Sequence, residues 1–290
     1  MCRPLVWPRS CRAPRNARPR TPVSSCSAGP RRSATGRRRS SETGGRIASR
    51  IEPFRISRHD RRNPNKNAAM IRLYHSPLSP FCRKVRLVLA EKRLEVELVE
   101  ERYWEKSVEF MRRNPAGKVP VLRIDGKTLT ESAPICEYIE ETVPEPSLMP
   151  NSADGRYEVR RLVMWFDDKF HSEVTSNLLY ERVNKKLMGQ GYPDSTRIKN
   201  GAKAIKYHLD YMGWLLDQRR WLAGDALTLA DFAAAAHLSA LDYISDVDWN
   251  RNANVREWYA KIKSRPAFRS LLADQVPSFP PPEHYANLDF

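Results

Sequence analysis

The pattern of apolar and polar residues becomes regular after residue 70. Ile71 and Leu73 alternate with less apolar neighbours, which predicts a half-buried strand. From Ser79 onward the spacing changes to three and four, with Val88 and Leu89 on one face of a helix. Ser79 is therefore expected at a strand-loop-helix junction.

Further segments extend this opening into a mixed pattern of strands and helices. Residues 95–100 alternate again, so the chain is expected to begin as strand, helix and strand, with the two strands parallel. Residues 119–124 predict another strand, and Asp125-Gly126 turns the chain back as a hairpin. A helical stripe then begins near residue 132.

The second half of the chain has the spacing of helices only. Residues 144–151 contain three prolines, which exclude a continuing helix or strand and predict a linker. Beyond it, apolar residues recur at three and four across 157–187 and 195–218, as in long amphipathic helices. The predicted units are a first domain, a linker, a second domain and a proline-rich tail, at residues 70–143, 144–151, 152–275 and 276–290.

Residues 1–69 differ in composition from the rest. They contain 17 Arg and one Lys but three acidic residues, which gives +15 of the formal net charge of +16. Without apolar periodicity this segment cannot bury enough surface to offset its chain entropy, so we expect a disordered basic leader. Its composition resembles a transit peptide, and an RNA-binding arm is an alternative. We favour upstream sequence translated from a misplaced start, with Met70 as the natural one.

The other 221 residues are nearly neutral and lack the basic surface on which nucleic-acid binding usually depends. No apolar run reaches the ~18 residues of a membrane span, and we expect a cytoplasmic protein. Only Cys82 and Cys136 fall in this part, which argues against a disulfide framework. His171, His208 and His237 lack convergent Cys or carboxylate spacing, so no metal site is predicted.

Three local features favour one kind of site. Ser79 opens a helix, where free N–H groups and the helix dipole stabilise an anion such as a thiolate. Pro120 in an apolar strand predicts a cis bond after Val119 that exposes the Val119 backbone to a peptide-like ligand; an ordinary edge-strand proline is the alternative. Glu131 and Ser132 are either a clamp for an amino-acid head group or a surface Glu beside a capping Ser.

The order of these motifs resembles the thioredoxin-like half of glutathione transferases, and the similarity covers roughly residues 70–275. The resemblance implies an α/β thioredoxin-like N-terminal domain followed by an all-α helical C-terminal domain. It also implies that Ser79 stabilises the glutathione thiolate, since a hydroxyl hydrogen bond lowers the thiol pKa. The implied glutathione-binding residues are Lys118 for the glycyl carboxylate, Val119 for the cysteinyl backbone, and Glu131 and Ser132 for the γ-glutamyl end.

Two other motifs have structural interpretations. Ser79 and Cys82 have the spacing of a Cys-x-x-Cys motif with the first Cys replaced, so dithiol redox cycling is excluded. Cys82 could form a mixed disulfide with glutathione, but we favour a small buried hydrophobe. Thr228 and Asp231 form a predicted capping box, similar to one in the second domain of the family, and Asp231 is not expected to be a catalytic acid.

The tail at 276–290 is longer than a generic transferase needs. Its prolines favour an extended segment with a low ordering cost, either a partner-binding peptide or a strap over its own body. The residues assigned to partner binding are Tyr285, Leu288, Asp289 and Phe290.

The tail, the 165–170 helix and the 246–250 loop together resemble one branch of the family, the α-proteobacterial division regulators that bind the tubulin-like polymer FtsZ. This resemblance implies a homodimer that binds FtsZ and the division machinery and is recruited to the division site. We therefore favour an FtsZ-binding regulator of constriction. An active glutathione transferase that uses Ser79 is the alternative.

Overall fold

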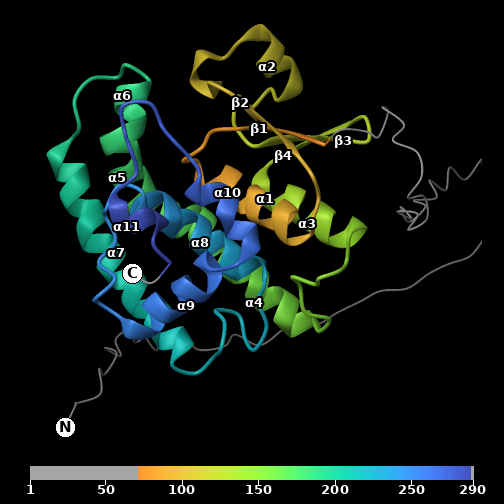
Figure 1. Ribbon diagram of the computed structural model, residues 1–290, viewed down its shortest axis with the longest axis vertical. Coiled ribbons are helices and arrows are strands. Elements are labelled where there is room, and N and C mark those ends of the chain that lie inside the picture. The colour runs from red at the N-terminus through yellow and green to blue at the C-terminus, as the bar shows by residue number, and fades with distance from the viewer. Residues whose placement is uncertain (1–70, 289–290) are drawn as a thin grey trace, which may run out of the picture. The chain divides into compact units, whose positions relative to one another are not determined.

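The computed structural model of this chain describes residues 71–288 (Figure 1). The predicted leader at 1–69, Met70, Asp289 and Phe290 lie outside the described residues. The first half of the described chain alternates strands and helices. Its elements are β1 (Arg72–His75), α1 (Pro80–Glu91), β2 (Glu97–Glu100), the 3-10 turn η1 (Tyr103–Glu105), α2 (Val108–Arg113), β3 (Val121–Ile124), β4 (Lys127–Thr130) and α3 (Ser132–Thr142).

The strands form one mixed sheet in the order β2-β1-β3-β4. β1 and β2 are parallel, with Leu73 opposite Leu98, whereas β3 is antiparallel to both β1 and β4. The parallel pair and the β3-β4 hairpin confirm the predicted order of elements. The two short helices η1 and α2, which connect β2 to β3, were not predicted.

Helices cover both faces of this sheet. Successive residues of a strand point to opposite faces, and Leu73 and Leu122 accordingly pack into the main hydrophobic core with α1 and α3. Tyr74 and Val121 point the other way and join Phe110 of α2 in a smaller cluster. Figure 1 shows α2 on one side of the strands and α1 and α3 on the other.

The second half is helical, as predicted, but its first long helix is not uniform. Between residues 153 and 187, α-helical and π-helical segments alternate without a break. The elements are α4 (Ala153–Met164), π-helix η2 (Trp165–Thr175), α5 (Ser176–Leu179), π-helix η3 (Tyr180–Asn184), α6 (Lys185–Leu187), α7 (Ser195–Leu216), α8 (Leu229–Asp242), α9 (Ala253–Lys263), 3-10 turn η4 (Pro266–Phe268), α10 (Arg269–Leu272) and α11 (Glu283–Ala286).

Helix α8 is buried along its whole length and packs against α1. The predicted capping box begins it, because an Asp231 carboxylate oxygen accepts the N–H and the hydroxyl of Thr228 at 2.9 and 3.0 Å. The other oxygen of Asp231 accepts the Leu222 N–H and the Trp258 indole N–H, both at 2.9 Å. Asp231 therefore joins the start of α8 to a preceding loop and to α9, which is a structural role.

The segment predicted as a linker is packed rather than open. Leu148 and Met149 are buried in the main core. Lys92 at the end of α1 donates to the Pro146 carbonyl at 2.7 Å and pairs with Glu140 of α3 at 2.6 Å. The linker is thus fixed against α1 and α3.

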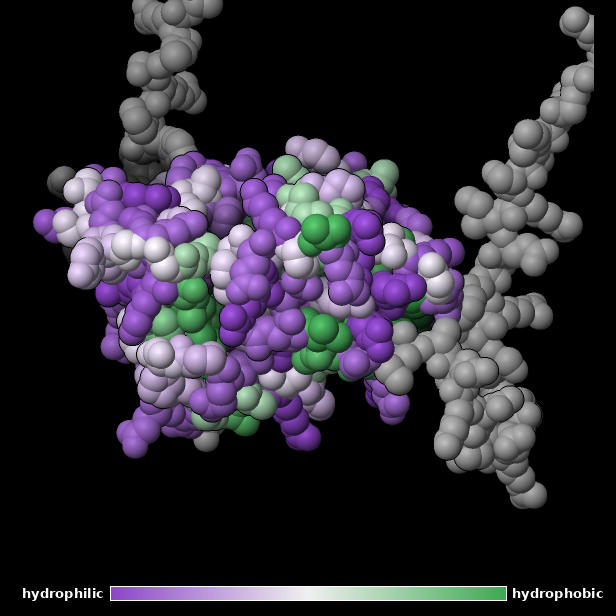
Figure 2. All heavy atoms as spheres, turned by 90° about the horizontal axis from the view of Figure 1, so that it is seen from above, coloured by the Kyte–Doolittle hydropathy of each residue, from purple (hydrophilic) through white to green (hydrophobic). Residues whose placement is uncertain are grey.

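No helix in the described part of the chain is both long and apolar enough to cross a membrane. On the face seen in Figure 2, hydrophobic residues form small separate groups among hydrophilic ones. Such scattered exposure is ordinary for a protein surface and identifies no interface on that face.

Candidate functional site

The register of the sheet brings the predicted site residues to one edge. β1 ends at His75, and its antiparallel partner β3 begins opposite Tyr74 at Val121. β4 ends at Thr130, which is also opposite Val121. The loop after β1, the segment before β3 and the start of α3 therefore leave the sheet at the same end, although more than fifty residues separate the first of them from the last.

Ser79 is the N-cap of α1. Its Oγ accepts the Cys82 N–H at 3.4 Å, and its own N–H donates to the Ser76 carbonyl at 3.1 Å, which closes the loop after β1. Because the hydroxyl accepts from the helix, its proton is available to a ligand. The geometry is suited to stabilising an anion, since the positive end of the α1 dipole is at the same place.

Val119 precedes a cis peptide bond, the conformation expected before Pro120. The side chain of Val119 is buried beside Cys82 and Phe110, and within residues 71–288 no backbone hydrogen bond uses its N–H or C=O. The preceding loop is held by Asn114, whose amide donates to the Lys118 carbonyl at 2.8 Å. The Lys118 side chain is exposed.

Glu131 and Ser132 begin α3. Glu131 has φ 67°, a backbone region that residues other than glycine rarely adopt and that is concentrated at functional sites. The first hydrogen bond of the helix runs from the Ile135 N–H to the Glu131 carbonyl at 3.0 Å. The N–H groups of Ser132 and Ala133 precede it and therefore have no acceptor within the helix. Such N–H groups are suited to binding a carboxylate. No pattern in the sequence predicts the unusual backbone of Glu131.

Cys82 is fully buried on α1, in agreement with its interpretation as a small hydrophobe. Burial raises the pKa of its thiol to about 11, although the hydrogen bond with Ser79 opposes this shift. The thiol is therefore neutral near pH 7, which disfavours a mixed disulfide at this residue.

A cluster of rings beside Ser79 was missed by sequence reasoning. Phe81 lies 4.9 Å from the ring of His171 and 5.7 Å from that of His237, measured between centroids. Burial lowers the pKa of His171 to about 4, with smaller contributions from neighbours that include the Lys118 charge. η2 therefore borders the same site. No sequence signal identifies this contact, because the rings come from α1, η2 and α8.

A cavity of about 190 Å³ borders the loop that carries Ser79. Pro77 and Leu78 line it from the loop, Trp104 from η1 and Leu187 from α6. Across residues 71–288, no group of three or more His, Cys, Asp or Glu side chains is placed to hold a metal ion.

The assignment of Tyr285 to partner binding is wrong. Tyr285 lies on α11 and has no exposed surface, because its ring is buried in the main core. The ring is T-shaped against that of Tyr243, with 5.1 Å between the centroids. The tail up to α11 follows the other expectation, a strap over the body. Leu288 is 43% exposed, while Asp289 and Phe290 lie outside the described residues.

The chain is similar to proteins of known family in sequence and structure. Residues 73–147 match the glutathione S-transferase N-terminal domain, and residues 195–261 match the C-terminal domain. FtsZ-localized protein A of Caulobacter vibrioides is 47% identical over 223 residues, covering 75% of this chain and 97% of that protein. Two solved structures, a glutathione S-transferase from Rhodospirillum rubrum F11 and FzlA from C. crescentus, are 53% and 46% identical, with TM-scores of 0.75 and 0.74. Each alignment covers 76% of this chain and 100% of the other.

Proposed function

Because the chain belongs to the glutathione S-transferase family, we propose that it acts within that family as an FtsZ-binding regulator of bacterial cell division and constriction. The observation that carries the proposal is the 47% identity over 97% of FtsZ-localized protein A. An alignment of this extent includes both halves of the fold and is not confined to the shared thioredoxin-like motifs. We place the protein in the cytoplasm, recruited to the division site.

The end of the chain is the segment we assign to the partner. Tyr285 and the strap before it hold the tail against the body, and Leu288 just beyond α11 is exposed. Leu288, Asp289 and Phe290 are an apolar, an acidic and an aromatic residue that a partner could bind. Because the strap is already held against the body, binding would not have to pay the entropy of ordering it. We propose that these three residues contact FtsZ or another division protein.

A homodimer forms part of the same proposal. Four of the large apolar side chains exposed on the described chain lie on α4 and α7: Tyr157, Met164, Tyr207 and Trp214, each about half exposed or more. The ring of Trp165, the first residue of η2, lies 4.5 Å from that of Tyr211 in α7, and both side chains are partly exposed. An apolar face of this kind favours contact with another protein. The exposed Glu141 of α3 provides an acidic group complementary to the lysines of α7.

The proposal is tested by co-pelleting the purified chain with GTP-assembled FtsZ from the same organism. Saturable pelleting is expected, together with its loss when residues 288–290 are deleted or Asp289 is changed to Lys. A globular protein of similar size serves as the pelleting control. Pelleting no greater than that of the control would reject FtsZ binding.

Sedimentation of the free protein tests the dimer, and Trp214→Glu should convert the dimer to a monomer.

The alternative function is glutathione conjugation at Ser79, and one observation favours it. The register of β1, β3 and β4 brings Ser79, Val119 and Glu131 to the same edge of the sheet, with a cavity beside the Ser79 loop that could take an electrophile. In this function Ser79 donates to the glutathione thiolate, the Val119 backbone pairs with the cysteinyl residue, Ser132 and Glu131 hold the glutamyl end, and Lys118 neutralises the glycyl carboxylate. The rate at which the protein consumes an aryl halide in the presence of glutathione measures this conjugating activity.

A further inference from the structure

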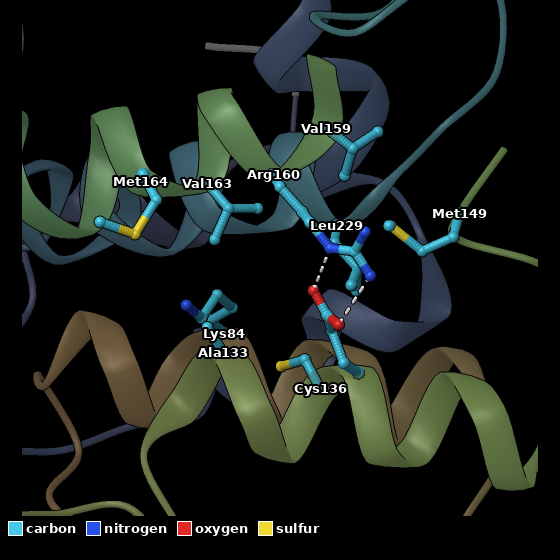
Figure 3. A pocket seen from close by; sticks show the side chains of 10 residues that line it. Lys84, Ala133, Cys136, Met149, Val159, Arg160, Val163, Met164 and Leu229 are labelled. Carbon is cyan, nitrogen blue, oxygen red and sulfur yellow. Dashed lines mark hydrogen bonds and ion pairs between the residues drawn. The ribbon is translucent and has the colours of Figure 1, made fainter. Parts of the chain in front are cut away.

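A cavity of about 170 Å³ lies where the two halves of the fold meet (Figure 3). It lies between α3 and α4, with α1, the linker and the start of α8 completing the wall. Seven apolar or thiol side chains line it: Ala133, Cys136, Met149, Val159, Val163, Met164 and Leu229. None of its lining residues belongs to the Ser79 loop or to the tail.

The charged groups at this cavity are compensated within the protein. Arg160 of α4 donates two hydrogen bonds to the Glu137 carboxylate of α3, at 2.8 and 3.0 Å, and both side chains are partly exposed at the rim (Figure 3). Lys84, from α1, is buried and its ammonium is paired with Asp167 of η2. A charged ligand would have to displace one of these partners, whereas a neutral ligand leaves both pairs intact.

The thiol in the wall does not favour covalent chemistry. Cys136 is 1% exposed, and burial raises the pKa of its thiol to about 12. The thiolate is the reactive form of cysteine, so this group is inert at neutral pH and behaves as an apolar wall atom.

We propose that this cavity is a binding site for a small neutral apolar molecule, of the size of one aromatic ring or a short alkyl chain, held without a covalent bond. Its volume is close to that of an engineered apolar cavity of about 150 Å³ in another protein that stays dry and binds benzene. Methionine contributes to the fit because its flexible, polarizable side chain adapts to irregular apolar surfaces, and Met149 and Met164 both line the cavity.

The site can be tested with benzene and the full chain labelled with ¹³C at the methionine methyl groups. Saturable shifts are expected for Met149 and Met164. Met111 in α2 and Met212 in α7, which do not line the cavity, are internal controls. Shifts that do not saturate up to the solubility limit of benzene, or that are equally large at Met111 and Met212, would overturn the proposal.

A cavity-filling variant adds a second test. Ala133→Leu places a larger side chain in the cavity and should weaken benzene binding at least about tenfold, whereas Ala202→Leu, at an exposed position of α7, should leave it unchanged. Circular dichroism confirms folding of both variants. If Ala133→Leu does not fold, Cys136→Ala replaces it, because the enlarged cavity should shift the preference from benzene toward naphthalene. Unaltered binding in the filled variant, or unaltered preference in the enlarged one, would contradict the assignment.

The remaining competitor for the cavity is a side chain from a second copy of the protein. In that case benzene binding would fall as protein concentration rises, in step with dimer formation measured by sedimentation, and the small-molecule proposal would be rejected. Benzene affinity that is independent of protein concentration supports it. Neither measurement involves FtsZ.

Discussion

Arg83 donates a 2.9 Å hydrogen bond to the hydroxyl of Tyr285, 202 residues further along the chain. The Arg83 side chain is fully buried, and it also donates to the Pro77 carbonyl at 2.8 Å, the Ser239 hydroxyl at 2.9 Å and Asp274 at 3.0 Å. One guanidinium therefore connects the loop before Ser79, the centre of α8 and the tail. The strap is fixed to the helix that carries the candidate site.

Tyr285→Phe is expected to destabilise the protein by about 1–3 kcal/mol, because the Leu271 carbonyl loses its donor and Arg83 loses an acceptor, while the ring still fills the core. Urea unfolding measures the free energy. Amide hydrogen exchange should also become faster in residues 76–79. Tyr192→Phe, at a side chain that is 93% exposed, is the matched control and should change little. Equal stability of the two variants would show that the Tyr285 hydroxyl is dispensable.

Ser79→Ala and Ser79→Gly both remove the hydroxyl, but they differ as helix caps. Alanine should cost about 1 kcal/mol of stability and glycine only a few tenths. In an FtsZ-binding regulator, both variants should co-pellet with FtsZ as the wild type does. If the protein also conjugates glutathione, both should lose the activity by orders of magnitude while Ser79→Thr retains part of it. Loss of FtsZ binding in both variants would contradict the favoured function.

The stability of the protein should fall as the solution is acidified below about pH 6.5. Burial, assisted by the charges of Arg86 and Arg83, lowers the pKa of His75 from 6.5 to about 4. Between these values the unfolded chain binds a proton that the native His75 does not, so acidification favours unfolding. The expected slope is up to about 1.4 kcal/mol per pH unit from this residue.

Urea titrations between about pH 7 and pH 5 measure that slope. His75→Asn should make it shallower, because asparagine does not titrate, whatever the variant does to stability at pH 7. The remaining slope includes His171, whose pKa is also lowered to about 4 by burial. A slope that is the same in wild type and variant would show that His75 does not contribute.

Gly213 and Asn252 are expected to be energetically coupled. A Cβ at Gly213 would lie 1.9 Å from the Asn252 amide nitrogen, and Asn252 caps α9 by accepting the Val255 N–H at 3.1 Å. Gly213→Ala alone displaces that cap, a cost of about 1 kcal/mol that offsets the gain from better helix propensity. In an Asn252→Ala background the same change should stabilise by up to about 1 kcal/mol. Additive effects in this double-mutant cycle would rule out the coupling.

Local patterns were sufficient to predict the parallel strand pair, the hairpin and the helical second half. Spacing of two residues in a strand, or of three and four in a helix, depends only on which face of the element is buried. The capping box was also predictable, because its two partners, Thr228 and Asp231, are only three positions apart in the sequence. The π-helical segments were not, because a sequence with helical spacing does not distinguish an α-helix from a π-helix. For η1 and α2 no prediction was made.

The sequence by itself determined the order of the elements, the Ser79 helix start and the family resemblance, all of which depend on residues close together in the chain. It left two conformations open at Pro120, and the structure decided for the cis bond. Only the tertiary structure decided that Tyr285 is a core residue, because its burial depends on Arg83 and Tyr243, which the sequence does not place beside it. The same holds for the Phe81 and His171 rings and for the cavity at Cys136. Each requires side chains from distant elements to meet, and such meetings follow from packing rather than from periodicity.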